Sequence, residues 1–157
     1  MGWKRKYEPI KAGNENLRVI DARHAFIINN ILSEVIKTGT GKKARSLGRP
    51  DLAGKTGTTN DAFDAWFAGY QPTLAAITWF GFDSPKSLGK NQTGSAVALP
   101  IWIDFMKHAL KNVPIAFPVE PPGIVRIDDD LFTEDTTPPG GVLSIDVKTL
   151  DDKIDPT

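Results

Sequence analysis

Cysteine is absent from the 157-residue chain, which excludes disulfide bonds, thiol catalysis and cysteine-ligated metals. Long apolar runs are absent too, since no stretch approaches the roughly 20 residues that a membrane-spanning helix needs. The sequence starts Met-Gly-Trp-Lys-Arg-Lys with no apolar stretch behind it, so it does not resemble a secretory signal. If a parent protein is exported or anchored, we expect the signal to lie outside this chain.

Net charge is lacking as well. Lys plus Arg and Asp plus Glu both number 19, so the formal net charge at pH 7 is zero. A balanced chain offers no electrostatic attraction for nucleic acid or for an anionic membrane surface. Histidine occurs only as His24 and His108, and neither has ligand-like neighbours in the sequence. We therefore expect no metal, no cofactor and no nucleic-acid partner.

What is present suffices for one compact domain, since 40% of the residues are hydrophobic. Polar residues and chain breakers make residues 1–20 an irregular lead-in. Residues 21–112 carry the periodic patterns of a folded unit. Residues 113–157 are rich in Pro, Asp and Thr, and we expect an extended or disordered tail there, with one short strand at 141–147.

Two segments have the periodicity of amphipathic helices. Apolar residues recur at helical spacing after Asp21, a suitable N-cap, and Gly39 stands where a helix-ending glycine is expected. A second apolar stripe predicts a helix over residues 96–111, with Pro100 tolerated in its first turn. Between the first helix and the segments that follow, residues 39–50 are basic and glycine-rich, and we expect a loop.

Three strands are predicted between the helices, over residues 52–59, 63–70 and 74–82. Their connections are short, which favours antiparallel neighbours because a parallel pair needs a long crossover. The third strand is almost continuously apolar, so we expect burial on both of its faces. The aromatic residues expected in the core are Trp66, Trp79, Phe82 and Trp102. The order of helix, three antiparallel strands, helix and tail predicts an α+β fold with helices flanking the sheet.

The stretch most informative about chemistry is Gly-Lys-Thr-Gly-Thr-Thr-Asn-Asp, residues 54–61. Gly-Lys-Thr also ends the phosphate-binding loop of nucleotide-binding proteins, but that pattern needs a glycine where Arg49 stands. Such a loop also follows an apolar strand and opens a helix, whereas a basic segment precedes this motif. The sequence therefore disfavours a nucleotide site. Taken alone, the tripeptide fits equally a strand of small residues with an incidental lysine.

Five segments of the chain, one of which contains this motif, resemble segments of a single protein family. They are Ile31–Gly41, Leu52–Asp61, Asp64–Tyr70, Thr78–Asp83 and Ala98–Met106. In this order they resemble the C-terminal part of the transpeptidase domain of class A, bifunctional penicillin-binding proteins of the 1a type. The resemblance covers roughly residues 20–127 and includes the Lys-Thr-Gly motif of these enzymes. It implies the penicillin-binding/β-lactamase-like transpeptidase fold.

The resemblance implies part of a serine D,D-transpeptidase, which cross-links peptidoglycan stem peptides ending in D-Ala-D-Ala and is acylated by β-lactams. It further implies roles in cell-wall biosynthesis, cell shape and antibiotic resistance. The implied location is the periplasmic or extracytoplasmic face of the bacterial inner membrane, with any anchor outside this chain. No cofactor or metal is implied.

The resemblance implies that Lys55 is the catalytic residue of this chain, where it gives electrostatic and proton-relay support to the nucleophile. The substrate-binding residues are Thr56, Gly57, Thr58 and Thr59. The hydroxyls of Thr56 and Thr58 hold the substrate carboxylate, and the Thr58 N–H donates to the oxyanion. Because side chains alternate along a strand, we expect Thr56 and Thr58 on one face and Lys55 and Gly57 on the other.

Two of the three catalytic motifs of the family are missing. No Ser-x-Asn occurs, and the single Ser-x-x-Lys, Ser87–Lys90, contains a glycine and follows the Lys-Thr-Gly motif. We therefore expect this chain to be inactive alone and to have the remainder of the transpeptidase domain as its partner. Without that partner the apolar strand 74–82 would be an unpaired edge. The alternative is a non-catalytic module of the same fold that binds peptidoglycan or a protein.

Overall fold

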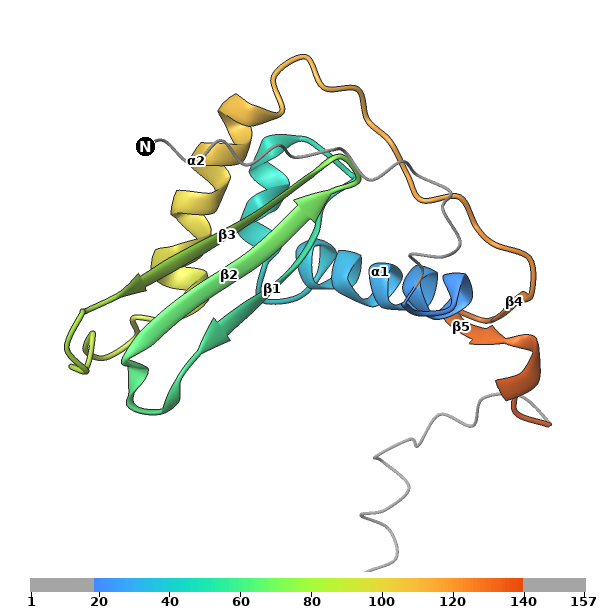
Figure 1. Cartoon of the computed structure of the whole chain (residues 1–157), viewed down its shortest axis with the longest axis horizontal. Coiled ribbons are helices and arrows are strands. Elements are labelled where there is room, and N and C mark those ends of the chain that lie inside the picture. Colours follow the sequence, from blue (N-terminus) through green and yellow to red (C-terminus); the bar gives the residue numbers. More distant parts are fainter. Residues whose placement is uncertain (1–18, 140–157) are drawn as a thin grey trace, which may run out of the picture.

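The computed structural model of the protein describes residues 19–139. Its elements follow the expected order of helix, three strands and helix, and a short hairpin comes after them (Figure 1). The predicted α+β fold is confirmed. The elements are α1 (Ala22–Lys37), β1 (Ala53–Thr58), β2 (Asp64–Gln71), β3 (Leu74–Gly81), α2 (Leu99–Ala109), β4 (Ile124–Ile127) and β5 (Asp130–Thr133).

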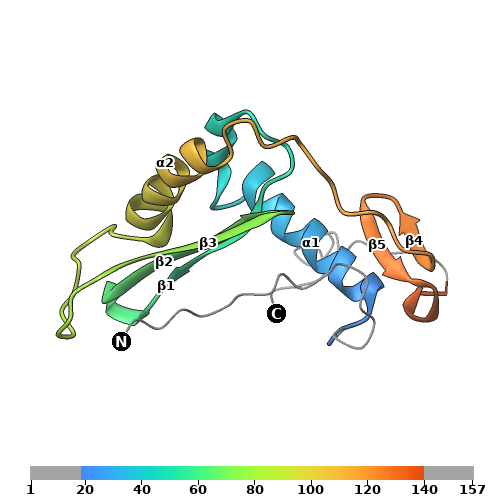
Figure 2. The same cartoon turned by 45° about the horizontal axis from the view of Figure 1, so that its top comes forward.

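The first three strands form an antiparallel sheet in the order β1-β2-β3, as their short connections predict. The register places Gly57 opposite Trp66, and Trp66 opposite Trp79. Among the described residues, β1 and β3 each have a neighbouring strand on one side only, so both are sheet edges. Helix α2 lies along one face of the sheet, whereas α1 contacts β1 near one end of the sheet (Figure 2).

The core lies between α2 and the sheet face that this helix covers. Phe67 of β2 and Trp102 of α2 meet edge to face with ring centroids 5.0 Å apart, and both side chains are fully buried. The Trp102 indole N–H donates to the carbonyl of Ala76 at 3.1 Å, which satisfies its polar atom inside the core. The other core residues are Ile36, Ala44, Leu52, Ala98, Leu99, Met106 and Leu110.

Replacing Gly69 with alanine is expected to destabilise the fold. A Cβ at this position would lie 2.6 Å from Cε1 of Phe67 and 2.7 Å from Cζ2 of Trp102, so the core would be overpacked. Overpacking of this kind lowers the free energy of unfolding by about 1–3 kcal/mol. Urea unfolding checks this, with Ala68→Val on the exposed side of the same strand as the control. An equal loss in both variants would contradict the packing argument.

Several aromatic side chains predicted in the core lie on the surface instead. Trp66, Trp79 and Phe82 are 42%, 44% and 49% exposed, whereas Trp102 is buried as predicted. The prediction that β3 is buried on both faces is also wrong, because Ile77 is 68% exposed. The physical reason is that α2 covers one face of the sheet, and no described element covers the opposite face at these side chains.

The segments predicted as loop and tail contain structure that the sequence analysis missed. Residues 39–50, predicted as a loop, include the 3-10 helix Lys42–Leu47, whose Ala44 is buried against the core. After α2, the strands β4 and β5 form an antiparallel hairpin. These elements are too short to show the periodic patterns from which regular structure is predicted. The strand predicted at 141–147 lies outside the described residues.

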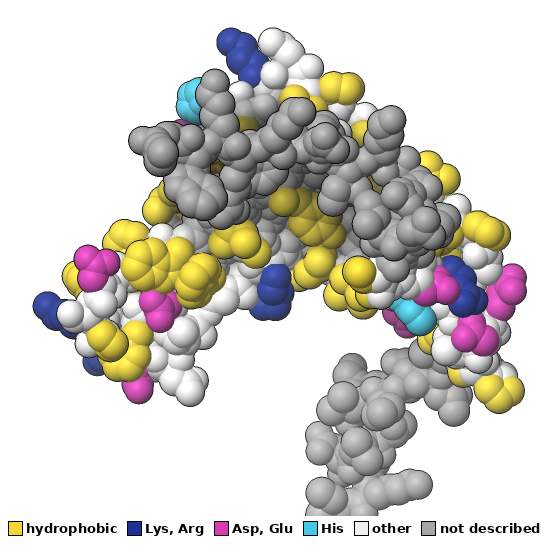
Figure 3. Space-filling view, viewed as in Figure 1, with side chains coloured by type: hydrophobic (Ala, Val, Ile, Leu, Met, Phe, Trp, Pro, Cys, Tyr) yellow, Lys and Arg dark blue, Asp and Glu magenta, His cyan; other side chains and the backbone are white. Residues whose placement is uncertain are grey.

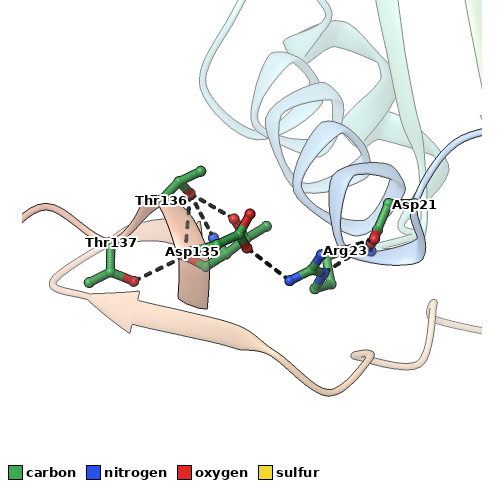
Figure 4. A network of polar contacts seen from close by, with 6 residues as sticks. Asp21, Arg23, Asp135, Thr136 and Thr137 are labelled. Carbon is green, nitrogen blue, oxygen red and sulfur yellow. Dashed lines mark hydrogen bonds and ion pairs between the residues drawn. The ribbon is translucent and has the colours of Figure 1, made fainter.

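An arginine near the start of α1 links this helix to the hairpin (Figure 4). Asp21 caps the helix as predicted, because its carboxylate accepts a hydrogen bond from the Arg23 N–H at 2.7 Å. The Arg23 guanidinium pairs with Asp21 at 3.0 Å and with Asp135, just after β5, at 2.9 Å. Hydrogen bonds from Arg23 lower the pKa of Asp21 to about 2, so this carboxylate is charged at neutral pH.

Candidate substrate-binding strand

Strand β1 carries the Lys-Thr-Gly motif along one edge of the sheet. The register places Thr56 opposite Phe67, on the face that α2 covers, and Thr58 lies on the same face. Lys55 and Gly57 lie on the other face. The predicted alternation is confirmed.

The backbone of β1 presents hydrogen-bonding groups to the outside of the sheet. The Thr59 N–H donates to the Asp64 carbonyl at 3.1 Å, so the backbone groups of residue 59 point toward β2. Because this direction alternates along a strand, those of Thr58 and Thr56 point away from β2. The Lys55 ammonium donates to the outward Thr56 carbonyl at 2.8 Å, which agrees with this direction. No described strand pairs with this edge, so an extended ligand can reach the Thr58 N–H.

The two threonine hydroxyls on the α2 side of the strand each have a partner in the protein. Thr56 Oγ1 lies 2.8 Å from Oγ1 of Thr40, in the segment after α1. Thr58 Oγ1 accepts a hydrogen bond from the Gly94 N–H at 3.1 Å. Neither partner can be predicted from the sequence, because they lie 16 and 36 residues from the threonines that they contact and no local pattern marks them.

Gly94 begins the π-helical turn Gly94–Ala98 that leads into α2, and its backbone packs closely on β1. A Cβ at Gly94 would lie 2.6 Å from the carbonyl oxygen of Gly57 and would also clash with the carbonyl of Trp66. Only glycine permits this approach without displacing the backbone. The close approach is what brings the Gly94 N–H to the Thr58 hydroxyl.

The turn after β1 is held by two further hydroxyls. Thr59, predicted to bind substrate, accepts a hydrogen bond from the Asp64 N–H at 2.8 Å through its hydroxyl. Ser87 donates to the Asp61 carbonyl at 2.7 Å. The segment Ser87–Lys90 is not helical, so it lacks the one-turn spacing that would bring its serine and lysine together.

The sheet face that carries Lys55 is largely apolar and exposed. Lys55 is in line with Ile77 across the three strands, and the next row holds Trp66 and Trp79, whose ring centroids are 6.2 Å apart. Figure 3 shows hydrophobic side chains gathered over the strands. An exposed apolar surface of this kind is typical of a region that another polypeptide covers.

An open groove of about 840 Å³ lies apart from the motif, between the 3-10 helix Lys42–Leu47 and α2. It is lined by Lys43, Ser46, Leu47, Arg49, Pro100, Ile103, Asp104, Met106, Lys107 and Leu110, and includes none of the motif residues. Within residues 19–139, no group of three His, Asp or Glu side chains could hold a metal ion. No helix in this part of the chain is long and apolar enough to cross a membrane.

The model of one protein family, described as the penicillin binding protein transpeptidase domain, matches residues 4–107. The chain belongs to this family. A penicillin-binding protein 1A from Pseudomonas aeruginosa is 51% identical over 123 residues, which are 78% of this chain and 15% of that protein. A penicillin-binding protein 1A from Neisseria lactamica is 41% identical over 138 residues, covering 87% of this chain and 17% of that protein.

A solved structure gives the same result for the fold. The crystal structure of penicillin-binding protein 1A from Haemophilus influenzae matches with a TM-score of 0.68 and 36% sequence identity. The match covers 80% of this chain and 20% of that one. The resemblance to 1a-type penicillin-binding proteins is thus confirmed. The chain spans about a sixth of the length of the curated relatives, 15% and 17% in the two cases above.

Proposed function

We propose that this chain supplies the substrate-binding strand of a serine D,D-transpeptidase that cross-links peptidoglycan stem peptides and is acylated by β-lactams. The observation that carries the proposal is the edge of β1 with which no described strand pairs, where the backbone groups of Thr56 and Thr58 point away from the sheet. An extended peptide can add to such an edge as a further strand. Membership of the transpeptidase family supports the proposal.

A stem peptide ending in D-Ala-D-Ala brings a carboxylate and a reactive carbonyl to this edge. In the proposal, the Thr56 and Thr58 hydroxyls bind the carboxylate, and the Thr58 N–H stabilises the oxyanion that forms at the carbonyl. Lys55 adds positive charge near the nucleophile and supports its proton transfer. Gly57 relieves a tight cross-strand contact, since a Cβ there would lie 3.3 Å from Cβ of Trp66.

Thr59 completes the substrate-binding residues in this proposal, and its hydroxyl also holds the turn after β1. Its hydroxyl is bonded to the Asp64 N–H, at the point where β1 ends and the chain turns into β2. This contact fixes the position of the neighbouring Thr58 at the strand edge.

The nucleophile belongs, in this proposal, to the remainder of the transpeptidase domain, which carries the Ser-x-x-Lys and Ser-x-Asn motifs. Lys55 shares its sheet face with the exposed Ile77, Trp66 and Trp79, so the remainder is placed over this face and buries these side chains. A strand of the remainder pairs with the open edge of β3. The complete enzyme works in cell-wall synthesis at the periplasmic face of the inner membrane, with consequences for cell shape and antibiotic resistance.

A chimera tests the proposal directly. The 123-residue matching segment of the Pseudomonas aeruginosa relative is replaced by the corresponding residues of this chain. We expect a fluorescent penicillin to label the chimera covalently at the serine that the relative contributes. The same reagent should leave the isolated chain unlabelled. Its single Ser-x-x-Lys lies in a non-helical loop, and it contains no Ser-x-Asn.

Each failure of this experiment has a distinct meaning. Covalent labelling of the isolated chain would refute the placement of the nucleophile outside it. A folded but unlabelled chimera, beside a labelled parent relative, would refute the proposed enzyme function. If the isolated chain then still bound a D-Ala-D-Ala peptide, the result would favour the alternative, a non-catalytic module that binds peptidoglycan.

A further inference from the structure

A threonine outside the motif contacts the strand that binds substrate in the proposed function. Thr40 Oγ1 lies 2.8 Å from Thr56 Oγ1, within hydrogen-bonding distance. We infer that Thr40 is a positioning residue, which orients the Thr56 hydroxyl so that its proton is directed to the carboxylate of a bound peptide. The inference rests on the proposed function and extends it by one residue.

The backbone around Thr40 is fixed by hydrogen bonds on both sides. The Gly39 N–H donates to the Glu34 carbonyl at 3.2 Å, and the Gly41 N–H donates to the Val35 carbonyl at 2.9 Å. A Cβ on Gly41 would lie 2.9 Å from Cδ1 of Ile36, so this glycine packs directly against the helix end. Thr40 is therefore held between two residues that are tied to the last turns of α1.

The neighbouring hydroxyl shows how such a contact works. Thr58 Oγ1 receives a hydrogen bond from the Gly94 N–H, and an amide N–H can only donate. The hydroxyl of Thr58 therefore keeps its own proton available for an external acceptor. Gly94 fixes the Thr58 oxygen and leaves the donor free.

The hydrogen bond between Thr40 and Thr56 can run in either direction, since either hydroxyl can be the donor. A carboxylate is an acceptor only, so binding it commits the Thr56 proton to the ligand. Thr40 must then be the donor to Thr56. This arrangement forms a chain from Thr40 to Thr56 to the carboxylate, in which each hydrogen bond polarises the next. Without the Thr40 hydroxyl, the Thr56 hydroxyl loses this partner and is less well oriented.

The test uses the isotopically labelled full-length chain titrated with N-acetyl-D-Ala-D-Ala, followed by NMR at the backbone amides of residues 55–59. Thr40→Val keeps the side-chain shape and removes the hydroxyl, and we expect it to weaken binding about threefold to tenfold. Thr40→Ser keeps the hydroxyl and should restore wild-type affinity. The amide N-acetyl-D-Ala-D-Ala-NH2 lacks the carboxylate, and it should bind weakly and with the same affinity to wild type and to Thr40→Val.

A double-mutant cycle separates orientation from general structural support. In the Thr56→Val background, Thr40→Val should have no further effect on affinity, because the hydroxyl that it orients is gone. A further loss in that background would overturn the inference, as would equal affinity of wild type and Thr40→Val. If wild type shows no carboxylate-dependent shifts at all, the proposed function of the strand fails, and the inference fails with it.

Discussion

Replacing Lys55 with alanine in the chimera described above is expected to slow acylation by penicillin by about 10²-fold to 10⁴-fold, the usual range for a side chain that supports proton transfer. Lys55 is exposed on the sheet face that the proposal assigns to the catalytic partner, and its ammonium bonds the Thr56 carbonyl at 2.8 Å. Removing the charge leaves the fold of β1 intact but deprives the serine of its electrostatic support. Stopped-flow acylation with a fluorescent penicillin measures the rate.

Lys90 provides the matched control, since it is the lysine of the Ser87–Lys90 sequence in an exposed loop. Lys90→Ala should leave the acylation rate of the chimera unchanged. Thermal unfolding of the isolated chain should show the same midpoint for both variants as for the unsubstituted chain, because neither side chain is buried in it. A rate that depended on Lys90 and not on Lys55 would overturn the assignment of the Lys-Thr-Gly strand as the site.

Asp51→Ala should lower the free energy of unfolding by about 3–5 kcal/mol. The Asp51 side chain is completely inaccessible to solvent, and its carboxylate pairs with the Arg49 guanidinium at 2.7 Å. It also accepts a hydrogen bond from the Ala116 N–H at 3.1 Å, so it ties the segment after α2 to the start of β1. Removing Asp51 leaves the largely buried Arg49 cation without its counter-charge.

Urea unfolding at pH 7 measures the effect, and Asp83→Ala is the control because Asp83 lies exposed in the loop after β3. The control should change the free energy of unfolding by no more than about 0.5 kcal/mol. A loss at Asp51 no larger than that of the control would show that the buried pair contributes nothing beyond an exposed carboxylate.

The Asp51 carboxylate should also make the stability of the fold depend on pH. Burial raises the pKa of Asp51, but hydrogen bonds from Arg49 and from the Ala116 N–H outweigh it, so the pKa lies below its ordinary value. A group whose pKa is lowered on folding stabilises the folded state above its unfolded pKa, near 3.9. Its contribution is therefore complete above about pH 5 and is lost as the pH falls through the lowered pKa. The difference in stability between wild type and Asp51→Ala should shrink in that acidic range.

The sequence by itself determined the order of the two helices and the three strands between them, and the placement of the motif on a strand. Short connections such as Gln71–Thr73 exclude parallel crossovers, so the three strands had to pair as neighbours. The strict alternation of side chains then put Thr56 and Lys55 on opposite faces. Five matching segments in a constant order also identified the family, because family motifs are local patterns that a sequence displays directly.

Only the tertiary structure decided which surfaces are covered and which distant groups meet. Trp66 and Trp79 have large aromatic side chains of the kind usually found in cores, yet they are exposed because no described element covers their face. The partners of the motif hydroxyls, Thr40 and Gly94, are small residues without a local signal, and chain folding alone brings them to β1. Periodicity records which side chains share a face, whereas contacts between segments depend on how those faces pack against one another.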